Sequence, residues 1–414
     1  MENVLAILLA GGAGERLHPL TRETAKPAVP FGGAYRIIDF TLSNCINSNL
    51  RRIFVLTQYK SLELIRHIRD GWSIVSPELG EYIEIIPAER QAGWYRGTAD
   101  AVYQNTGSIL AEPADQVLIL AGDQIYKMNY SSMLEQHRRL NADITIATTQ
   151  VSPEEADRFG IIETGPDQRV VGFEEKPRHG HPVRSIFNPD MLSASMGIYI
   201  FNRDLLARVL REDAEAPGSS HDFGKDVIPR CLRDCRVMAY DFVDINAKQA
   251  RYWRDVGTLD AYYEANMDLV AVTPQLNLYD STWPIRTRLL QQPPAKFVFA
   301  QEGRRMGVAV DSIVSAGCII SGGRVMHSVL SPGVRVNSYC EVEFSILMPN
   351  AEIGRYSRIR RAIIDSNVKV PESSVIGFDA EEDRRNGYHL TESGIVVVSG
   401  AAPVQIAQKA RSVE

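Results

Sequence analysis

Three glycines and two cations near the amino terminus have the residue types and spacing of a phosphate-binding loop. They lie in the stretch "LLAGGAGERLHPLTRETAKPA" and are Gly11, Gly12, Gly14, Arg16 and Lys26. Backbone N–H groups in a glycine loop after a buried strand can hold phosphate oxygens, and nearby cations add charge. A leucine takes the third glycine place of the dinucleotide fingerprint, and no Gly-Lys-Ser/Thr follows. The stretch therefore predicts a nucleotide-binding loop whose backbone contacts the ligand, with a glycine turn that binds no ligand as the alternative.

Two carboxylates have positions suited to a metal ion. Asp123 lies just beyond an apolar run in "VLILAGDQIY", and Asp255 lies in the glycine-containing loop "YWRDVGT". Mg²⁺ prefers few protein oxygens together with phosphate oxygens and water. We therefore expect the two carboxylates to hold one Mg²⁺, with a capping role for Asp123 as the alternative.

The elements that must position these residues alternate between two kinds. From residue 4 to about 272, apolar runs without polar alternation are separated by amphipathic stretches, which is typical of an α/β domain with a mostly parallel sheet. Helices are predicted at "SLELIRHIRDGW" and "YSSMLEQHRRL". The predicted strands are "VLAILLAG", "RIFVLTQ", "YIEIIPA", "QVLILAGD", "DITIATT" and "SMGIYIF". Ligands of such sheets gather at the carboxyl ends of the strands.

The last quarter of the chain follows a different rule, because residues from 313 onward repeat every seventeen positions with three aliphatic columns. Successive columns lie six residues apart, which indicates a triangular parallel β-helix with the aliphatic side chains stacked inside and four evident coils. The columns are Ile313, Leu330, Leu347 and Ile364; Ile319, Val336, Ile353 and Val370; and Val325, Val342, Ile359 and Ile376.

Prolines at 274, 284, 293 and 294 mark a linker between these two patterns. We therefore predict a catalytic domain over 1–272, a linker over 273–305, and a β-helix domain with a carboxyl-terminal tail over 306–414. A solenoid with open ends needs caps or a partner. Oligomer contacts and regulation are the roles expected of the second domain.

Composition excludes several classes of protein. The 414 residues carry a net charge of −6, which argues against nucleic-acid or membrane-surface binding and requires local cations for any anionic substrate. The odd number of five cysteines favours reduced thiols. The amino terminus has an acidic second residue and a short apolar run, unlike a signal peptide, so we expect the protein in the cytoplasm. No apolar run approaches the length that spans a membrane.

Several longer motifs together resemble one enzyme family. "FGGAYRIIDFTLSNCINS", "WYRGTADAV", "AGDQIYKMNY", "FEEKP", "ASMGIYIF", "SHDFGKDVIP" and "YWRDVGTLDAYYEANMDL", with the opening loop, are similar to the bacterial glucose-1-phosphate adenylyltransferases, or ADP-glucose pyrophosphorylases, among the sugar-nucleotide pyrophosphorylases. The resemblance implies a Rossmann-like nucleotidyltransferase domain followed by a left-handed hexapeptide-repeat β-helix. It implies Mg²⁺-dependent adenylyl transfer from ATP to α-D-glucose 1-phosphate, giving ADP-glucose and pyrophosphate for glycogen synthesis. A homotetramer and sugar-phosphate or nucleotide effectors are also implied.

The resemblance assigns roles to particular positions. Asp123 and Asp255 resemble the Mg²⁺ carboxylates, and the catalytic set is Asp123 with Arg16 and Lys26, the two cations gripping the triphosphate. The nucleotide bed comprises Ala10, Gly11, Gly12, Gly14, Arg16, Lys26 and Gly122. The glucose 1-phosphate pocket comprises Tyr95, Gly160, Glu175, Lys176 and Ser195, with Lys176 taking the phosphate and Glu175 a sugar hydroxyl.

Three positions depart from the family pattern. Ala13 replaces an arginine of the opening loop, which leaves Arg16 as the loop's cation, and Glu89 in "PAERQ" lies near a position linked to adenine recognition. His18 stands where the fructose-bisphosphate-activated branch carries an effector-binding lysine. A histidine is only partly charged at neutral pH, so weak or absent bisphosphate activation is expected, or His18 has no role.

Three other functions stay open at this point. Another pyrophosphorylase, making dTDP-, UDP- or GDP-sugars, shares the opening loop and "EKP" but usually lacks "RIIDFTLSN". A non-catalytic regulatory subunit would not need Asp123, Lys176 and Asp255. An acyltransferase is suggested by the hexapeptide β-helix alone, and it ranks last.

Overall fold

The computed structural model describes most of the chain in two compact units. The described residues are 3–12, 14–88, 93–177, 185–186, 188, 190–246, 251–301 and 305–400. The first unit comprises Met1–Ala13, Ile38–Trp253 and Leu278–Arg286, and the second comprises Gly14–Ile37, Arg254–Asn277 and Thr287–Glu414. The chain therefore passes between the units more than once.

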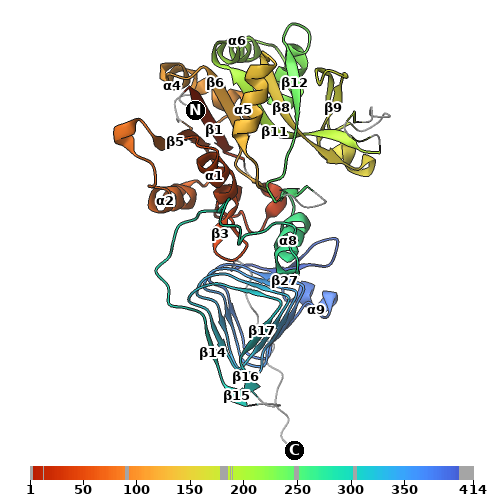
Figure 1. The fold of residues 1–414 in the computed structure, drawn as a ribbon. Helices are drawn as coiled ribbons and strands as arrows, with labels where there is room; N and C mark the ends of the chain where they lie inside the picture. The colour runs from red at the N-terminus through yellow and green to blue at the C-terminus, as the bar shows by residue number, and fades with distance from the viewer. Residues whose placement is uncertain are drawn as a thin grey trace, which may run out of the picture. The chain divides into compact units, whose positions relative to one another are not determined.

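The first unit is built on a nine-stranded sheet. Its main path runs β10-β9-β11-β6-β1-β4-β5, and β8 pairs with both β11 and β12. The pairs of β1 with β4 and β6, of β4 with β5 and of β8 with β12 are parallel, whereas β11 runs antiparallel to its neighbours. The strands are β1 (Val4–Ala10), β4 (Arg52–Thr57), β5 (Tyr82–Pro87), β6 (Gln116–Ala121), β8 (Ile144–Val151), β9 (Gly160–Thr164), β10 (Val170–Glu175), β11 (Leu192–Asn202) and β12 (Val237–Asp241). Figure 1 shows β5 and β9 toward opposite ends of this sheet.

All six predicted strands are present, as β1, β4, β5, β6, β8 and β11. The central ones are continuous apolar runs because their side chains are buried on both faces, as in β1, where every residue except Leu9 is fully buried. The mostly parallel sheet is therefore confirmed. The outer strands β9 and β10 and the strand β12 were not predicted.

Helices cover the sheet, and both predicted helices are confirmed as α2 and α5. Asn129 caps α5 by accepting a hydrogen bond from the backbone N of Ser131 at 2.9 Å. The helices of this unit are α1 (Ile37–Asn47, whose first residue belongs to the second unit), α2 (Leu62–Gly71), α3 (Thr98–Gln104), α4 (Thr106–Ala111), α5 (Tyr130–Arg139), α6 (Arg203–Ala214), the π-helix η5 (Phe223–Val227) and α7 (Ile228–Cys231). A short strand, β7, covers Gln124–Tyr126.

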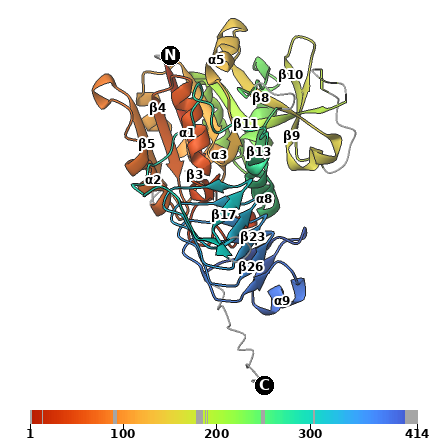
Figure 2. The same ribbon diagram turned by 60° about the horizontal axis from the view of Figure 1, so that its bottom comes forward.

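The second unit contains a parallel β-helix, as the seventeen-residue repeat predicts. Its coils appear as nested triangles in Figure 1, and Figure 2 shows β17, β23 and β26 stacked. Three parallel sheets form the three sides. The first has β14 (Lys296–Val298), β19 (Ile319–Ser321), β22 (Arg335–Val336), β25 (Glu352–Ile353) and β28 (Lys369–Val370). The second has β17 (Val308–Val310), β20 (Arg324–Met326), β23 (Glu341–Glu343), β26 (Arg358–Arg360) and β29 (Val375–Ile376). The third has β18 (Ile313–Val314), β21 (Val329–Leu330), β24 (Ile346–Leu347), β27 (Ala362–Ile364), β31 (Val396–Val398) and, antiparallel to β31, β30 (His389–Leu390).

Ten of the twelve predicted interior positions are confirmed, because they lie buried in one aliphatic core. Burial of each such side chain stabilises the fold by about 1.5–3 kcal/mol. The predictions for Ile313 and Ile319 are wrong. Val314 pairs with Leu330 and Ile320 pairs with Val336, so these neighbours occupy the columns. The first coil is one residue shorter than the others, which shifts its register.

Smaller elements complete the second unit. They are β2 (Pro30–Phe31), β3 (Tyr35–Arg36), the 3₁₀ helices at Glu15–Leu17 and Lys26–Ala28, α8 (Leu259–Met267), β15 (Ala300–Gln301), β16 (Arg305–Met306) and α9 (Ala380–Arg385). A further short strand, β13, covers Trp253–Asp255. Among the described residues, no helix is both long enough and apolar enough to cross a membrane.

Candidate active site

The predicted residues Ala10, Gly122 and Asp123 meet where two central strands end. Leu9 of β1 lies beside Ala121 of β6 in the parallel register, and the N of Gly122 donates to the Leu9 carbonyl at 3.1 Å. A Cβ on Gly122 would lie 3.2 Å from that carbonyl oxygen, so only glycine fits the close approach well. Asp123 follows, partly buried, at the carboxyl edge of the sheet.

The opening loop and Tyr95 lie together. A Cβ on Gly11 would lie 3.2 Å from the Cβ of Gln58 and 3.8 Å from a ring carbon of Tyr95, whereas one on Gly12 would meet nothing within 4 Å. The N of Tyr95 donates to Gln58 Oε1 at 2.6 Å, and its hydroxyl accepts from Asn105 Nδ2 at 3.1 Å. The Tyr95 ring is therefore held beside the glycine loop.

Glu175 and Lys176 form the centre of the predicted sugar-phosphate pocket. Glu175 pairs with Gly160 across β9 and β10, and a Cβ on Gly160 would lie 2.7 Å from Glu175 Oε2 and 2.6 Å from Phe173 Cζ. The Lys176 ammonium lies 3.2 Å from Glu175 Oε1, and its side chain is 53% exposed. Its N donates to the Phe159 carbonyl at 3.0 Å. At the end of β10, the Lys176 backbone is therefore held by a hydrogen bond, while its ammonium group is open to solvent.

Ser195 adjoins the same charges through a tyrosine. The Ser195 hydroxyl lies 3.4 Å from the Tyr199 hydroxyl and accepts from the N of Gly197 at 3.2 Å, at a register shift between β11 and β8. Burial raises the pKa of Tyr199; the hydrogen bond with Ser195 opposes this shift, and the charges of Asp222 and Glu175 add to it. Glu175 therefore lies near enough to Tyr199, the partner of Ser195, for its charge to act on the tyrosine, and the Tyr199 hydroxyl stays neutral.

Gln124, which the motifs did not single out, connects Asp123 to this pocket. Its Nε2 donates to the Met196 carbonyl at 2.8 Å, and its Oε1 accepts from Trp253 Nε1 at 3.2 Å. The Trp253 ring lies 5.3 Å from that of Phe159. Gln124 directly follows Asp123, so the only signal in the sequence was its place in "GDQIY".

Asp222 was also missed. It accepts from the hydroxyl of Thr98 at 3.1 Å and from the N of Gly224 at 2.9 Å, capping η5. A Cβ on Gly224 would lie 2.9 Å from Glu175 Oε2, so this cap lies against one residue of the predicted sugar-phosphate pocket. Its signal was "SHDFGKDVIP", which sequence reasoning used only for the resemblance.

The predicted triphosphate residues Arg16 and Lys26 lie in the second unit with Asp255. The buried Lys26 ammonium lies 3.3 Å from Asp255 Oδ1. A Cβ on Gly257 would lie 3.1 Å from both Arg16 Nη2 and Asp255 Oδ2, which places the Arg16 guanidinium beside the same carboxylate. Gly14 has φ +65°, and its carbonyl accepts from the Thr21 hydroxyl at 2.8 Å. Two cations therefore gather at Asp255.

Some predictions remain untested. Asp123 belongs to the first compact unit and Asp255 to the second, so their joint metal site stays a prediction. Both supply the hard carboxylate oxygens that a divalent cation prefers. In the described part of the chain, no three or more His, Cys, Asp or Glu side chains form a group able to hold a metal ion. His18 is exposed, and Ala13 and Glu89 lie outside the described residues.

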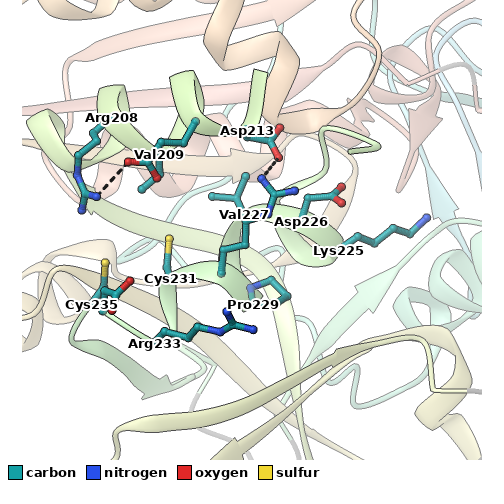
Figure 3. A pocket seen from close by; sticks show the side chains of 13 residues that line it. Arg208, Val209, Asp213, Lys225, Asp226, Val227, Pro229, Cys231, Arg233 and Cys235 are labelled. Atoms are coloured by element: carbon teal, nitrogen blue, oxygen red, sulfur yellow. Dashed lines mark hydrogen bonds and ion pairs between the residues drawn. The ribbon is translucent and has the colours of Figure 1, made fainter. Parts of the chain in front are cut away.

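A separate groove of 610 Å³ lies between α6 and the η5–α7 segment of the first unit (Figure 3). It contains the ion pairs of Arg208 with Glu212 at 3.2 Å and of Arg230 with Asp213 at 3.3 Å. The described residues that line it include none of the predicted site residues.

Two family models match the chain, one for each kind of architecture. The model described as "Nucleotidyl transferase" matches residues 5–271, and the one described as "GlmU-like, C-terminal hexapeptide" matches residues 293–398. The fold and the site thus define a nucleotidyl transferase that carries a left-handed parallel β-helix.

Curated relatives show which nucleotidyl transferases the chain resembles. The chain is 58% identical over 402 residues to a glucose-1-phosphate adenylyltransferase of Koribacter versatilis, with 96% of each chain covered. It is 54% identical to that of Rhodopirellula baltica, over 96% of this chain and 90% of the relative, and 50% identical to that of Teredinibacter turnerae, over 96% and 94%. The chain belongs to the glucose-1-phosphate adenylyltransferase family.

Proposed function

We propose that the protein transfers the adenylyl group of ATP to α-D-glucose 1-phosphate and releases ADP-glucose and pyrophosphate, the first committed step of glycogen synthesis. The observation that carries this proposal is the 58% identity to a glucose-1-phosphate adenylyltransferase over 96% of both chains. A phosphate oxygen of glucose 1-phosphate attacks the α-phosphorus of ATP, and the bond from that phosphorus to the β-phosphate oxygen breaks. The nucleophile is already ionised, so the reaction needs positioning and charge neutralisation rather than a general base.

The sugar phosphate would bind at the end of β10. The exposed Lys176 ammonium takes the phosphate, and Glu175, held between Gly160 and Gly224, accepts from a sugar hydroxyl. Ser195 and Tyr95 complete the pocket, and each already has a hydrogen-bond partner that fixes its position. The Phe173 ring and the Glu175 carboxylate both lie close over Gly160, so a larger side chain at position 160 would displace them.

The nucleotide would bind along the opening loop. The backbone would lie close to the phosphates at Ala10, Gly11, Gly12, Gly14 and Gly122. Arg16 and Lys26 would neutralise the triphosphate, and each would exchange part of its interaction with Asp255 for phosphate oxygens. Asp123 and Asp255 would hold Mg²⁺. When bound, the ion neutralises charge on the triphosphate.

Regulation and assembly extend this proposal. We assign the β-helix domain over 306–414 to oligomer contacts in a homotetramer and to sugar-phosphate or nucleotide effectors, with His18 as a candidate contact. Activator titrations at pH 6 and pH 8 test His18, since a histidine changes charge in this range. We place the protein in the cytoplasm because its five cysteines are all unpaired.

The product test is direct. The purified chain with ATP, glucose 1-phosphate and Mg²⁺ should release pyrophosphate and form ADP-glucose in equal amounts, identified by mass. Failure to form ADP-glucose in the forward direction, together with failure to form ATP from ADP-glucose and pyrophosphate in the reverse direction, would overturn the proposal.

A further inference from the structure

Helix α8 begins directly after the loop that carries Asp255. The Thr258 hydroxyl caps its amino terminus by accepting from the N of Ala261 at 3.2 Å. Val256 and Leu259 are buried on either side of this cap. The first turn of α8 therefore follows the Asp255 loop directly and is anchored by a cap and by two buried side chains.

One carboxylate ties this first turn to the β-helix. Asp260 Oδ1 accepts from the hydroxyl of Thr391 at 2.8 Å and from that of Ser393 at 2.5 Å. Both hydroxyls lie in the turn between β30 and β31, and β31 pairs with β27 of the stacked coils. The N of Ile395 donates to Thr391 Oγ1 at 3.1 Å, and Arg361 Nη2 donates to the Ser393 carbonyl at 3.2 Å. We call Asp260, Thr391 and Ser393 the α8 clasp.

The remainder of α8 contacts both the β-helix and the segment that carries Arg16 and Lys26. The Tyr263 hydroxyl donates to the Phe344 carbonyl at 2.6 Å, on the β-helix side. On the other side, Asn266 Oδ1 accepts from the N of Gly32 at 2.9 Å, and the Tyr262 hydroxyl donates to the Pro30 carbonyl at 2.5 Å. Helix α8 is thus hydrogen-bonded to the β-helix and to Pro30 and Gly32, which follow Lys26 in the chain.

We propose that Asp260 is a positioning residue for nucleotide binding: the α8 clasp uses the β-helix to hold the Asp255 loop where Lys26 and Arg16 can meet the triphosphate. The inference rests on the proposed function, because it concerns the ATP side of that reaction. Asp260 itself has no assigned contact with a substrate. Its effect is predicted to be selective, since the Glu175–Lys176 pocket lies in the other compact unit.

The test compares variants on the two sides of the clasp in the full-length enzyme. Asp260→Ala and the double variant Thr391→Val with Ser393→Ala each remove the same two hydrogen bonds, and Asp260→Asn retains an acceptor. Ser338→Ala is the matched control, because it removes a hydroxyl that donates to the Ser321 carbonyl at 2.7 Å within the β-helix. The KM values for ATP and glucose 1-phosphate, kcat and the melting temperature are measured for each.

Both clasp variants should raise the KM for ATP about fivefold or more and leave the KM for glucose 1-phosphate within about twofold. Combining them should add nothing further, since they break the same contact. Asp260→Asn should recover most of the loss, and Ser338→Ala should match the wild type. An unchanged KM for ATP in the Thr391/Ser393 variant, or equal changes for both substrates, would overturn the proposal. A wild-type chain that makes no ADP-glucose would overturn the proposed function instead.

Discussion

The ammonium of Lys26 lies 3.3 Å from Oδ1 of Asp255, although 229 positions separate the two residues in the sequence. Lys26 is 7% exposed, so its charge is held in a fixed place rather than solvated. A cation from the opening loop and a carboxylate from the end of the α/β sequence pattern therefore share one site. Because the Lys26 charge is already held near the site, only its exchange from Asp255 to the phosphate oxygens is needed when the triphosphate arrives.

Asp123→Asn should lower kcat by about a hundredfold or more while the fold remains intact, because a neutral amide no longer offers charged oxygens to a cation at the edge of the sheet. Asp115→Asn is the matched control. Asp115 precedes the same strand and accepts from Asn3 Nδ2 at 2.7 Å at the exposed end. Steady-state pyrophosphate release and circular dichroism provide the two readouts. An Asp123→Asn enzyme that retains more than a tenth of the wild-type rate contradicts the assigned role.

Lys176→Ala should raise the KM for glucose 1-phosphate about tenfold or more, since a charge-assisted hydrogen bond to phosphate is lost at a half-exposed site. The KM for ATP should change little. Arg158→Ala serves as the control, because this exposed cation lies beside Phe159 but pairs with Glu155 at 3.3 Å. If Lys176→Ala altered only the KM for ATP, the phosphate assignment would be wrong.

Gly160→Ala should also raise the KM for glucose 1-phosphate, by about tenfold, because the added Cβ would press on Phe173 and on the Glu175 carboxylate at 2.6 and 2.7 Å. Gly107→Ala is the matched change in α4, where an added Cβ meets nothing within 4 Å. It should leave the kinetics unchanged and stabilise the fold slightly. If the two alanine variants had equal kinetics, the assignment of Gly160 to the glucose 1-phosphate pocket would be wrong.

The native cysteines should react slowly with iodoacetamide at pH 8. Burial raises the pKa of Cys231 to about 12 and that of Cys318 to about 11, and it raises the pKa of Cys45, Cys235 and Cys340 as well. The thiols therefore stay protonated below these values, and the thiolate is the reactive form. Mass spectrometry should find five labels only after denaturation. Rapid native labelling of Cys231 would contradict its burial.

Local regularity explains what the sequence predicted well. Burial on both faces makes β1, β4 and β6 continuous apolar runs, which are visible in consecutive residues. The interior of the β-helix is visible in the same way, as evenly spaced aliphatic residues. The error at Ile313 and Ile319 arose because one shorter coil, whose shortened step contains Gly322 and Gly323, interrupts that spacing.

The candidate site was predicted as separate motifs rather than as an arrangement. "FEEKP" identified Glu175 and Lys176, but the approach of Ser195 through Tyr199 and the bridge from Gln124 to Met196 depend on contacts between distant strands. Such contacts follow from the tertiary fold and leave no fixed spacing in the chain. The pairing of Lys26 with Asp255 is likewise a contact between residues far apart in the sequence.

Nucleobase choice tests the central claim most directly. Pyrophosphate release should be measured with ATP, CTP, GTP, UTP and dTTP, each with glucose 1-phosphate and Mg²⁺ and with and without sugar-phosphate effectors. We predict that ATP gives the highest kcat/KM and that ADP-glucose is the product. A higher kcat/KM with CTP, GTP, UTP or dTTP, or no release with any nucleotide, would contradict the assignment.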